Sequence, residues 1–431
     1  MERIWTTELG RHVGERVRLA GWLHHQRQLS QVTFLLLRDR EGIAQVVVTI
    51  DSDRSWLGAV LPESVLEITG RVVASEQAPA GVELHEPDVV VVSRAEVAPP
   101  FELRRREIAA QLPTLLDHAA VSLRHPRRRA AAAIAAASVH GFRSALDAQH
   151  FTEIHTPKVV ASATESGANV FPIDWFGRTA FLAQSPQFYK QTMVGVFERV
   201  YEVAPVFRAE PHDTVRHLAE YVSLDAEIGF IVDHIDVMAI LRSVISGMIQ
   251  SVTERAAREL ALLGIELPAV LDEIPSIHFD DAQRLIEDAT GESVVGEVDL
   301  APSHERWLGD WAVREHGSEF VFVTGYPMVK RPFYTHPDPH RPSSSNSFDL
   351  LFRGLELVTG GQRLHRYGDY LEALRGTDTT PYDGYLEAFR HGMPPHGGFA
   401  IGLERWTARL TGAANIREVT LFPRDLHRLS P

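Results

Sequence analysis

The sequence predicts an α+β protein in which an all-β module at the N-terminus precedes a larger domain of mixed strands and helices. Five short runs rich in β-branched and apolar residues, separated by turn residues, lie within the first 98 residues. Beyond them, an alanine-rich run from Arg127 to His150 has high helix propensity. Apolar residues then recur at helical spacing between residues 233 and 264, and strand patterns lie between and after these two helical regions.

The N-terminal module, residues 1–98, is expected to be a small β-barrel. Its predicted strands are Arg16–Gln26, Val32–Leu37, Ala44–Ile50, Val65–Ala74 and Asp88–Ser93. Five strands in about a hundred residues suit a closed five-stranded barrel, and the OB-fold is the first expectation. Two prolines at 99 and 100 end the module. Residues 99–126 are then expected to form a polar connector or hinge, and residues 127–431 a second domain.

The composition is that of a soluble globular protein of two or three domains, with 431 residues, 44% hydrophobic and 23% charged. No uninterrupted apolar run approaches the ~18 residues of a membrane span, and the N-terminus lacks a signal-peptide core, so a cytoplasmic location is expected. The absence of cysteine excludes disulfides, thiolate nucleophiles and Cys-based zinc sites. A net charge of −14 argues against a protein that coats nucleic acid but leaves room for transient nucleic-acid contacts through local basic patches.

Lysine is scarce in this chain. Of the 43 lysine and arginine residues, only Lys158, Lys190 and Lys330 are lysines. Arginine therefore serves wherever a generic positive charge suffices, and a retained lysine points to a place that needs a compact ammonium group. This is a weak, independent indication that Lys190 is functional.

Two stretches carry most of the functional signal. The first runs from Val200 to Glu210, through a polar loop, into Tyr221–Ile228, where apolar and polar residues alternate as in a half-buried strand. Arg208 and Glu210 are two residues apart, so they are expected on one face of the incoming strand. The second stretch, Gly397–Arg405, opens on two glycines and ends on an arginine. Neither G-x-x-x-x-G-K-[ST] nor a strand-linked G-x-G-x-x-G occurs in the chain.

The segment Phe348–Leu357 reads as a β-hairpin with an Arg-Gly turn at residues 353 and 354. With that turn, Leu351 faces Glu356, and Asp349 lies diagonally on the same face. Two carboxylates on one face are a candidate Mg²⁺ site, because magnesium takes one or two carboxylates and completes its shell with phosphate and water. On this pattern alone, a pair of surface acids is the preferred interpretation.

The two stretches resemble motifs 2 and 3 of class II aminoacyl-tRNA synthetases, which bind ATP with arginines projecting from an antiparallel sheet. Phe151–Pro157, after the alanine-rich helix, resembles motif 1, which builds the dimer interface in that family; a helix leading into any sheet fits the pattern equally well. Thr164–Phe171, Gln184–Gln191 and Glu356–His365 resemble segments of aspartyl-tRNA synthetases, particularly the compact archaeal-type form. The resemblance spans nearly the whole chain, as far as Leu421–Asp425.

The resemblance implies a catalytic domain built on an antiparallel sheet flanked by helices, and a homodimer. It also implies a two-step reaction, in which the α-carboxylate of L-aspartate attacks the α-phosphorus of ATP and the 3′-hydroxyl of tRNA then attacks the aspartyl-adenylate. The implied catalytic residues are Arg208 and Arg405. The implied ATP-binding residues are Arg208, Glu210, Arg216, His217, Leu218, Glu356, Gly402 and Arg405. The implied Mg²⁺ ligands are Asp349, Glu356 and Thr359.

The same resemblance implies how aspartate is held. The aspartate-binding residues are expected to be Glu165, Gln187, Lys190, Arg208, Asp225, Thr359 and Arg363. Within this set, Glu165 is expected to hold the substrate ammonium, and Gln187, Lys190 and Arg363 its side-chain carboxylate. Two cations around a small anion select Asp over neutral Asn, because bound Asn leaves buried charges unpaired, a penalty of roughly 10⁴–10⁵ in selectivity.

The chain departs from the usual motif sequences of the family in two places. Ser166 stands where glycine is usual, and Ala400-Ile401 precede Gly402 in motif 3. Neither change removes a reacting group. Three rivals remain: an asparaginyl-tRNA synthetase, a tRNA-independent asparagine synthetase of the same architecture, and a non-catalytic tRNA-binding paralogue. The motif arginines argue against the non-catalytic reading, and Arg363 followed by Leu-His favours the aspartyl pattern.

The barrel is expected to read the anticodon. Phe34 is a candidate for stacking on a base, and Gln45 and Glu63 for reading a base edge, with His24 and Pro79 near the third anticodon base. Stacking on an aromatic ring is worth roughly 1–3 kcal/mol per base. Phe34 in an apolar strand is equally a candidate core residue.

The anticodons for Asp and Asn differ only at the third base. Forms of the family that are strict for tRNA-Asp resemble one another in carrying a tryptophan two residues after the Gly-Trp of the first strand and a lysine in a later loop. This chain has His24 at the first place and Pro79, in a loop without lysine, at the second. We therefore expect an enzyme that accepts both tRNA-Asp and tRNA-Asn; the alternative is that His24 packs at the barrel surface and strictness arises elsewhere.

Overall fold

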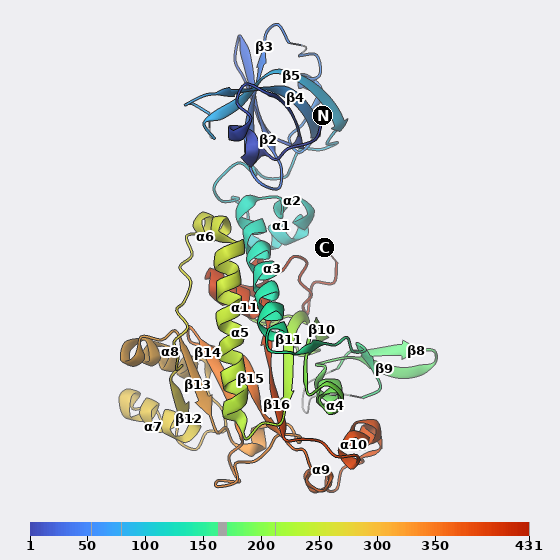
Figure 1. The fold of residues 1–431 in the computed structure, drawn as a ribbon, viewed down its shortest axis with the longest axis vertical. Helices are drawn as coiled ribbons and strands as arrows, with labels where there is room; N and C mark the ends of the chain where they lie inside the picture. The colour runs from blue at the N-terminus through green and yellow to red at the C-terminus, as the bar shows by residue number, and fades with distance from the viewer. Residues whose placement is uncertain (53, 79, 163–169, 212, 431) are drawn as a thin grey trace. The chain divides into compact units, whose positions relative to one another are not determined.

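The chain divides into two compact units, Met1–His125 and Pro126–Pro431, in the computed structural model (Figure 1). The structure describes residues 1–431 except 53, 79, 163–169, 212 and 431. Two short helices that the sequence did not predict, α1 (Leu112–Asp117) and α2 (Ala119–Ser122), lie in the part of the first unit that follows the barrel.

The first unit contains a closed five-stranded barrel of order β1-β2-β3-β5-β4, as expected for an OB-fold. Its strands are β1 (Arg16–Gln28), β2 (Val32–Arg38), β3 (Ile43–Thr49), β4 (Val65–Ala74) and β5 (Val82–Ser93), with 3-10 helices η1 (Thr6–Arg11) and η2 (Leu57–Ala59). Alternate apolar residues such as Leu19, Leu35 and Ile68 fill the interior. Strand β5 begins well before the predicted Asp88, because a register shift at Glu86 (φ 47°) hides the alternation.

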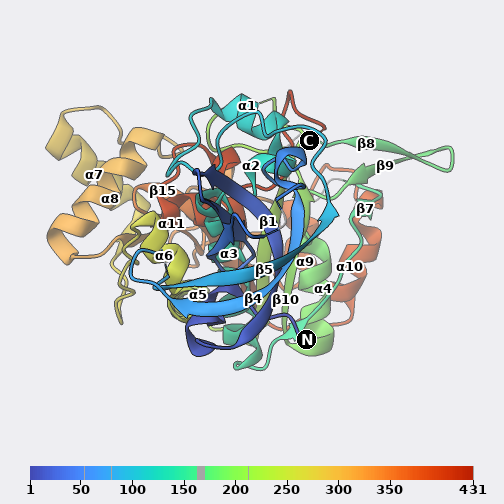
Figure 2. The same ribbon diagram turned by 90° about the horizontal axis from the view of Figure 1, so that it is seen from above.

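The second unit is built on an eight-stranded sheet of order β12-β13-β14-β15-β16-β11-β10-β6. Its strands are β6 (Thr152–Glu153), β10 (Arg199–Phe207), β11 (Glu220–Gly229), β12 (Ser276–His278), β13 (Phe320–Thr324), β14 (Ser347–Phe352), β15 (Leu355–Arg363) and β16 (His396–Gly402). All neighbours are antiparallel except the edge pairs β12–β13 and β6–β10. A separate three-stranded sheet contains β7 (Val159–Val160), β9 (Arg178–Leu182) and β8 (Pro172–Trp175), and its hairpin projects outward in Figure 1 and Figure 2.

Two long helices, α3 (Pro126–Asp147) and α5 (His234–Arg255), run side by side and share a core with the sheet (Figure 1). Their close approach requires glycine, because a Cβ at Gly141 would lie 2.5 Å from the carbonyl oxygen of Gly247. Helix α6 (Ala257–Leu263) follows α5 after a break at Ala256, and the two helices together cover the helical region predicted for residues 233–264. Helix α5 is long and apolar enough to pass for a membrane span by length and composition, but its apolar stripe lies in the core.

The remaining helices surround the sheet. They are α4 (Gln187–Phe197), α7 (Phe279–Thr290), α8 (Pro302–His316), α9 (Tyr367–Ala373), α10 (Asp383–Arg390) and α11 (Leu403–Thr411), with 3-10 turns η3 (Met328–Lys330), η4 (Thr380–Tyr382) and η5 (Ile416–Glu418). Helices α7 and α8 lie together beside the β12–β13 edge in Figure 1 and share an apolar cluster with the neighbouring strands. Helix α4 packs on β10 and β11 and supplies the lysine discussed below.

Candidate active site

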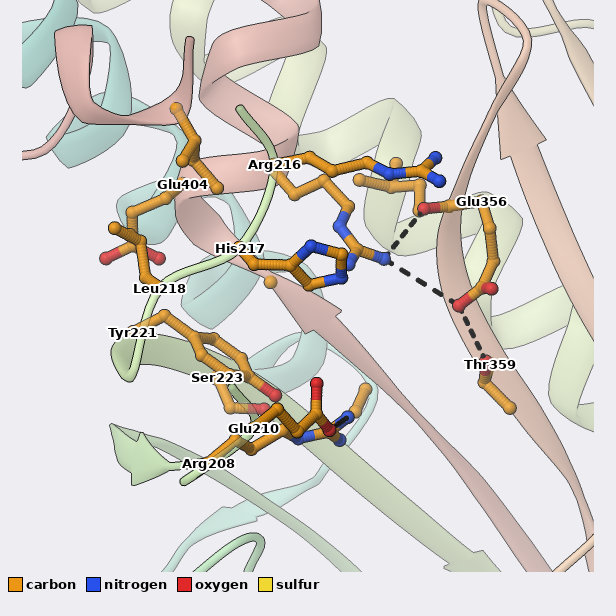
Figure 3. Close-up of a pocket in the computed structure, with 15 residues that line it drawn as sticks. Arg208, Glu210, Arg216, His217, Leu218, Tyr221, Ser223, Glu356, Thr359 and Glu404 are labelled. Atoms are coloured by element: carbon orange, nitrogen blue, oxygen red, sulfur yellow. Dashed lines mark hydrogen bonds and ion pairs between the residues drawn. The ribbon is translucent and has the colours of Figure 1, made fainter. Parts of the chain in front are cut away.

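The central strands β11, β15 and β16, helix α11 and the loop between β10 and β11 form a pocket (Figure 3). The pocket brings together predicted residues from separate parts of the chain: Arg208, Glu210, Arg216, His217, Leu218, Glu356, Thr359, Gly402 and Arg405. Every residue of the expected ATP-binding set lines it. Figure 3 shows Arg208 and Glu210 on one side of the pocket and Glu356 with Thr359 on another.

The sequence pattern predicted that Arg208 and Glu210 lie on one face of the incoming strand. Strand β10 ends at Phe207, so both residues lie just beyond it. The two side chains still face the same pocket, with Arg208 Nη1 3.9 Å from Glu210 Oε1. The Arg208 guanidinium also lies over the ring of Tyr221, 5.9 Å from its centroid. Tyr221 and Ser223 also line the pocket, but the sequence analysis did not predict them as site residues. They are two apart on β11 and therefore share one face of the strand.

The loop that carries Arg216 and His217 is held by a residue that the sequence did not single out. Arg417, in η5, donates from Nη1 to the carbonyl oxygen of Thr214 (3.0 Å) and from Nη2 to Asp213 (2.9 Å). Its Nε contacts Asp425 at 2.5 Å. The C-terminal segment therefore anchors the loop through one nearly buried guanidinium, and no local pattern signals this long-range contact.

Arg405 lies in the first turn of α11, directly after the end of β16. Its Nη1 donates to the backbone carbonyl of Glu356 (3.0 Å) and lies 3.7 Å from the Glu356 carboxylate. Its neighbour Glu404, which the sequence analysis missed, accepts from the backbone N–H of Val222 at 3.1 and 3.2 Å. Burial raises the pKa of Glu404 to about 7.

The predicted β14–β15 hairpin is confirmed, with positive φ at Arg353 (48°) and Gly354 (70°) and Leu351 opposite Glu356. A register shift after Leu350 adds one residue to β15, so Asp349 pairs with Thr359 while Glu356 stays on the same side. Thr359 Oγ1 donates to Glu356 Oε1 at 3.3 Å. In a regular strand, Glu356 and Thr359 would point to opposite faces, because they are three residues apart. The bulge places them on the same side, together with Asp349.

Asp349 is buried and faces both a cation and an anion. Its Oδ1 lies 3.1 Å from Arg331 Nη2. Burial raises the pKa of Asp349 to about 6; Arg331 opposes this rise and Glu356 adds to it. A cation between the two carboxylates would relieve their repulsion, so the donor chemistry fits a hard divalent ion. The described residues hold no cluster of three or more His, Cys, Asp or Glu that would form an all-protein metal cage.

Beneath the sheet surface lies a network of four buried charges from α4, β11 and β15. Lys190 Nζ lies 2.9 Å from Asp225 Oδ1 and 3.3 Å from Glu227 Oε2. Arg363 donates from Nε to Glu227 Oε1 (3.0 Å) and from Nη2 to the carbonyl oxygen of Gly398 (3.1 Å). Burial favours a higher pKa for Glu227, but Arg363 and Lys190 outweigh it, so the pKa lies below its usual value.

Glu227 was not among the predicted site residues, although it alternates with Asp225 on β11. Gln187, the first residue of α4, donates from Nε2 to Gln191 Oε1 at 2.9 Å beside this network. The network therefore gathers Lys190, Asp225 and Arg363 of the expected aspartate set, and Gln187 lies on the same helix as Lys190. Glu165 lies outside the described residues.

The expected anticodon residues lie in the barrel. Phe34 is half-buried on β2, on the opposite face from Leu35, and outside the apolar core cluster. Gln45 donates to Glu83 (2.7 Å). Glu63 is buried and accepts from Arg38 at 2.7 and 2.8 Å.

His24 is buried too, not at the barrel surface, and its Nδ1 lies 3.1 Å from Arg38 Nη1. Burial lowers the pKa of His24 to about 4, so the ring is neutral at physiological pH. A base contact through Glu63 or His24 therefore requires their shared arginine network to open. Pro79 lies outside the described residues.

Comparisons with known proteins agree with this arrangement. Residues 111–426 match the family described as class II tRNA synthetases (D, K and N), and residues 17–92 match an OB-fold nucleic acid binding domain. The Aspartate--tRNA(Asp/Asn) ligase of Thermus thermophilus is 48% identical over 431 residues, covering 100% of both chains. The Aspartate--tRNA(Asp) ligase of Pyrococcus horikoshii is 39% identical, covering 97% of both.

Among solved structures, asparaginyl-tRNA synthetase from Pyrococcus horikoshii complexed with asparaginyl-adenylate superposes with a TM-score of 0.92 at 30% identity, covering 100% of both chains. The fold, the arginine-lined pocket on an antiparallel sheet and these matches lead to one conclusion. The chain belongs to the class II aminoacyl-tRNA synthetases, in the group for aspartate, lysine and asparagine, and is an aminoacyl-tRNA ligase.

Proposed function

We propose that this enzyme attaches L-aspartate to tRNA through an aspartyl-adenylate. The observation that carries the proposal is the buried network that Lys190 of α4 and Arg363 of β15 form with Asp225 and Glu227 of β11. Strands β11 and β15 also line the arginine-lined pocket, through Ser223 and Thr359. ATP in the pocket and an acidic amino acid above the network would meet at the surface formed by β11, β16 and β15. This geometry suits attack of the substrate's α-carboxylate on the α-phosphorus.

The pocket residues divide the work of nucleotide binding. Arg208, at the end of β10, stabilises the charge that builds on the α-phosphate during the attack. Arg216, His217 and Arg405 hold the outer phosphates and the adenine, and Glu210 orients the adenine amino group. Because Arg405 is held by the Glu356 carbonyl and Arg208 lies over Tyr221, both guanidinium groups are oriented before ATP arrives.

The buried network selects the amino acid. Lys190 and Arg363 hold the side-chain carboxylate of aspartate with Gln187, and Asp225 and Glu227 keep the two cations in place. Asparagine would leave these buried charges without an anionic partner, which is the physical basis for discrimination. Glu165 is the proposed partner of the substrate ammonium.

A magnesium ion would be held by Asp349 and Glu356, with Thr359 beside them, and when bound it supplies positive charge to the phosphate oxygens. The chain's own contribution is a second cation, Arg331, which balances Asp349.

The enzyme is proposed to act in the cytoplasm as a homodimer with its interface over residues 130–157. Sedimentation at micromolar concentration is expected to show a dimer, and a 48.1 kDa monomer that charges tRNA would contradict this.

We infer relaxed tRNA selection, so that both tRNA-Asp and tRNA-Asn are charged with aspartate. The support is His24 in place of a tryptophan, a loop around Pro79 without lysine, and the higher identity to the relative whose name includes both tRNAs. The phosphate contacts of a tRNA carry no sequence information, so the third anticodon base must be read in the barrel.

The test is aminoacylation of purified tRNA-Asp and tRNA-Asn with labelled aspartate. Comparable kcat/KM for both is expected, and a preference for tRNA-Asp above a hundredfold, about 2.7 kcal/mol, rules out relaxed selection. ATP–pyrophosphate exchange with Asp and with Asn tests the amino acid separately. Exchange that depends on Asn rather than Asp would assign the chain to the asparaginyl rival.

A further inference from the structure

A second groove opens beside the nucleotide pocket and shares Arg216, Arg405 and Ile416 with it. Helix α8 contributes Arg306 and, at its first position, Pro302 to the wall. Helix α11 contributes Arg409, one turn after Arg405 and therefore on the same face of the helix. None of the functions proposed above uses Arg306 or Arg409.

The groove concentrates positive charge. Four arginines line it: Arg216, Arg306, Arg405 and Arg409. Neither Arg306 nor Arg409 forms a side-chain hydrogen bond or ion pair within the described part of the chain. Burial lowers the pKa of Arg409, and the charges of Arg216, Arg306 and Arg353 lower it further. These like charges are held together without enough acid to balance them.

The carboxylate of Glu305 stabilises the charge of Arg409. Glu305 is nearly buried, and burial raises its pKa. Its carboxylate already accepts from the backbone N–H of Glu356 at 3.1 Å and lies 3.8 Å from Arg216. With Glu305 beside Arg216 and Glu356 beside Arg405, two carboxylates face the four arginines, so the groove keeps a net positive charge at neutral pH.

We propose that this groove is a second phosphate subsite, which takes a chain of phosphates extending from the nucleotide pocket past Arg216 and Arg405. Planar guanidinium groups bind phosphate oxygens in pairs, and several around one cleft suit a ligand with several charges. Pro302, the first residue of α8, lines the groove, so the positive end of that helix dipole lies near it and favours the same ligand. The proposal rests on the proposed function, because it names where pyrophosphate or the ATP tail would extend.

The test compares wild type with Arg306→Gln, Arg409→Gln and the double variant, since glutamine keeps a polar side chain. Arg314→Gln is the matched control, because Arg314 is exposed on the same helix and pairs with Glu315. ATP–pyrophosphate exchange with aspartate gives the KM for ATP and for pyrophosphate separately. Titration calorimetry with inorganic pyrophosphate alone gives its affinity without turnover.

We expect the double variant to raise the pyrophosphate KM and its dissociation constant about tenfold or more, with the effect shrinking at high salt. A rise confined to pyrophosphate identifies the free product as the occupant, and an equal rise in the KM for ATP identifies the ATP tail. Unchanged KM values for ATP and for pyrophosphate, with an unchanged dissociation constant for pyrophosphate, would overturn the subsite. No exchange in wild type would instead refute the proposed function, so the two failures are distinguishable.

Discussion

The nucleotide pocket and the amino-acid network hold their cations in opposite ways. In the pocket, Arg208 and Arg405 are partly exposed, and their acidic neighbours lie at 3.9 and 3.7 Å. In the network, Lys190 and Arg363 are nearly fully buried and pair with acids at 2.9 and 3.0 Å. Water can solvate a pocket arginine that loses its partner, whereas a network cation cannot be solvated in this way.

Because of this difference in burial, charges in the pocket should matter for catalysis, whereas charges in the network should matter for stability as well. Removing a charge from the pocket should change catalysis and leave stability nearly intact, because exposed charges contribute little to the folding free energy. Removing a charge from the network should lower both catalytic activity and stability, because a buried charge is left without its partner. The four predictions below test that division, beginning with the largest expected effect.

Glu227→Ala is expected to destabilise the second unit by about 3–5 kcal/mol, since Lys190 and Arg363 lose a shared buried partner. Urea unfolding followed by tryptophan fluorescence measures the change. Glu210→Ala is the matched control, because it removes an acid from the exposed pocket. If both variants lose the same stability, the division between the two regions fails.

Arg208→Ala is expected to slow ATP–pyrophosphate exchange by roughly 10²–10³-fold, the effect of removing one oriented donor to the developing charge. Its unfolding midpoint should match that of wild type. Arg375→Ala, at an exposed arginine paired with Glu372 far along the chain, should change neither quantity. Exchange within threefold of wild type would remove Arg208 from the chemistry.

Asp349 makes a pH-dependent contribution to stability. Its pKa is about 6 in the folded state and near 3.8 unfolded, so the folded state binds the proton more tightly. Its contribution is therefore fully present below pH 4 and lost as pH rises through 6, a change of roughly 2–3 kcal/mol. As pH rises from 4 to 6, the unfolding free energy of wild type should therefore fall relative to that of Asp349→Asn. A pH-independent difference would contradict the raised pKa.

Lys190→Met is expected to raise the KM for aspartate about tenfold, with the KM for ATP within twofold, because Arg363 remains to hold the substrate carboxylate. Arg363→Leu is the complementary variant and should act in the same direction. A normal requirement for aspartate in either variant would show that the carboxylate is held elsewhere.

Local patterns determined much of the fold. Alternation of apolar and polar residues located the barrel strands, and helix propensity located α3, because both depend on residues within a few positions of one another. The Arg-Gly turn at 353 and 354 was predictable for the same reason. The residues that line the nucleotide pocket were predictable because they lie in contiguous motifs, and the resemblance of those motifs to a family supplied their roles.

Tertiary structure alone decided the rest. The extra residue in β15, which brings Glu356 and Thr359 to one side, follows from pairing with β14 and leaves no trace in the sequence alternation. Arg417 reaches across the fold to Thr214, and Glu227 joins a lysine and an arginine from distant segments. Likewise, Arg306 of α8 and Arg409 of α11 line one groove because the fold brings these distant segments of the chain together. Sequence periodicity specifies which face a residue occupies, but contacts between distant segments depend on how those faces pack together.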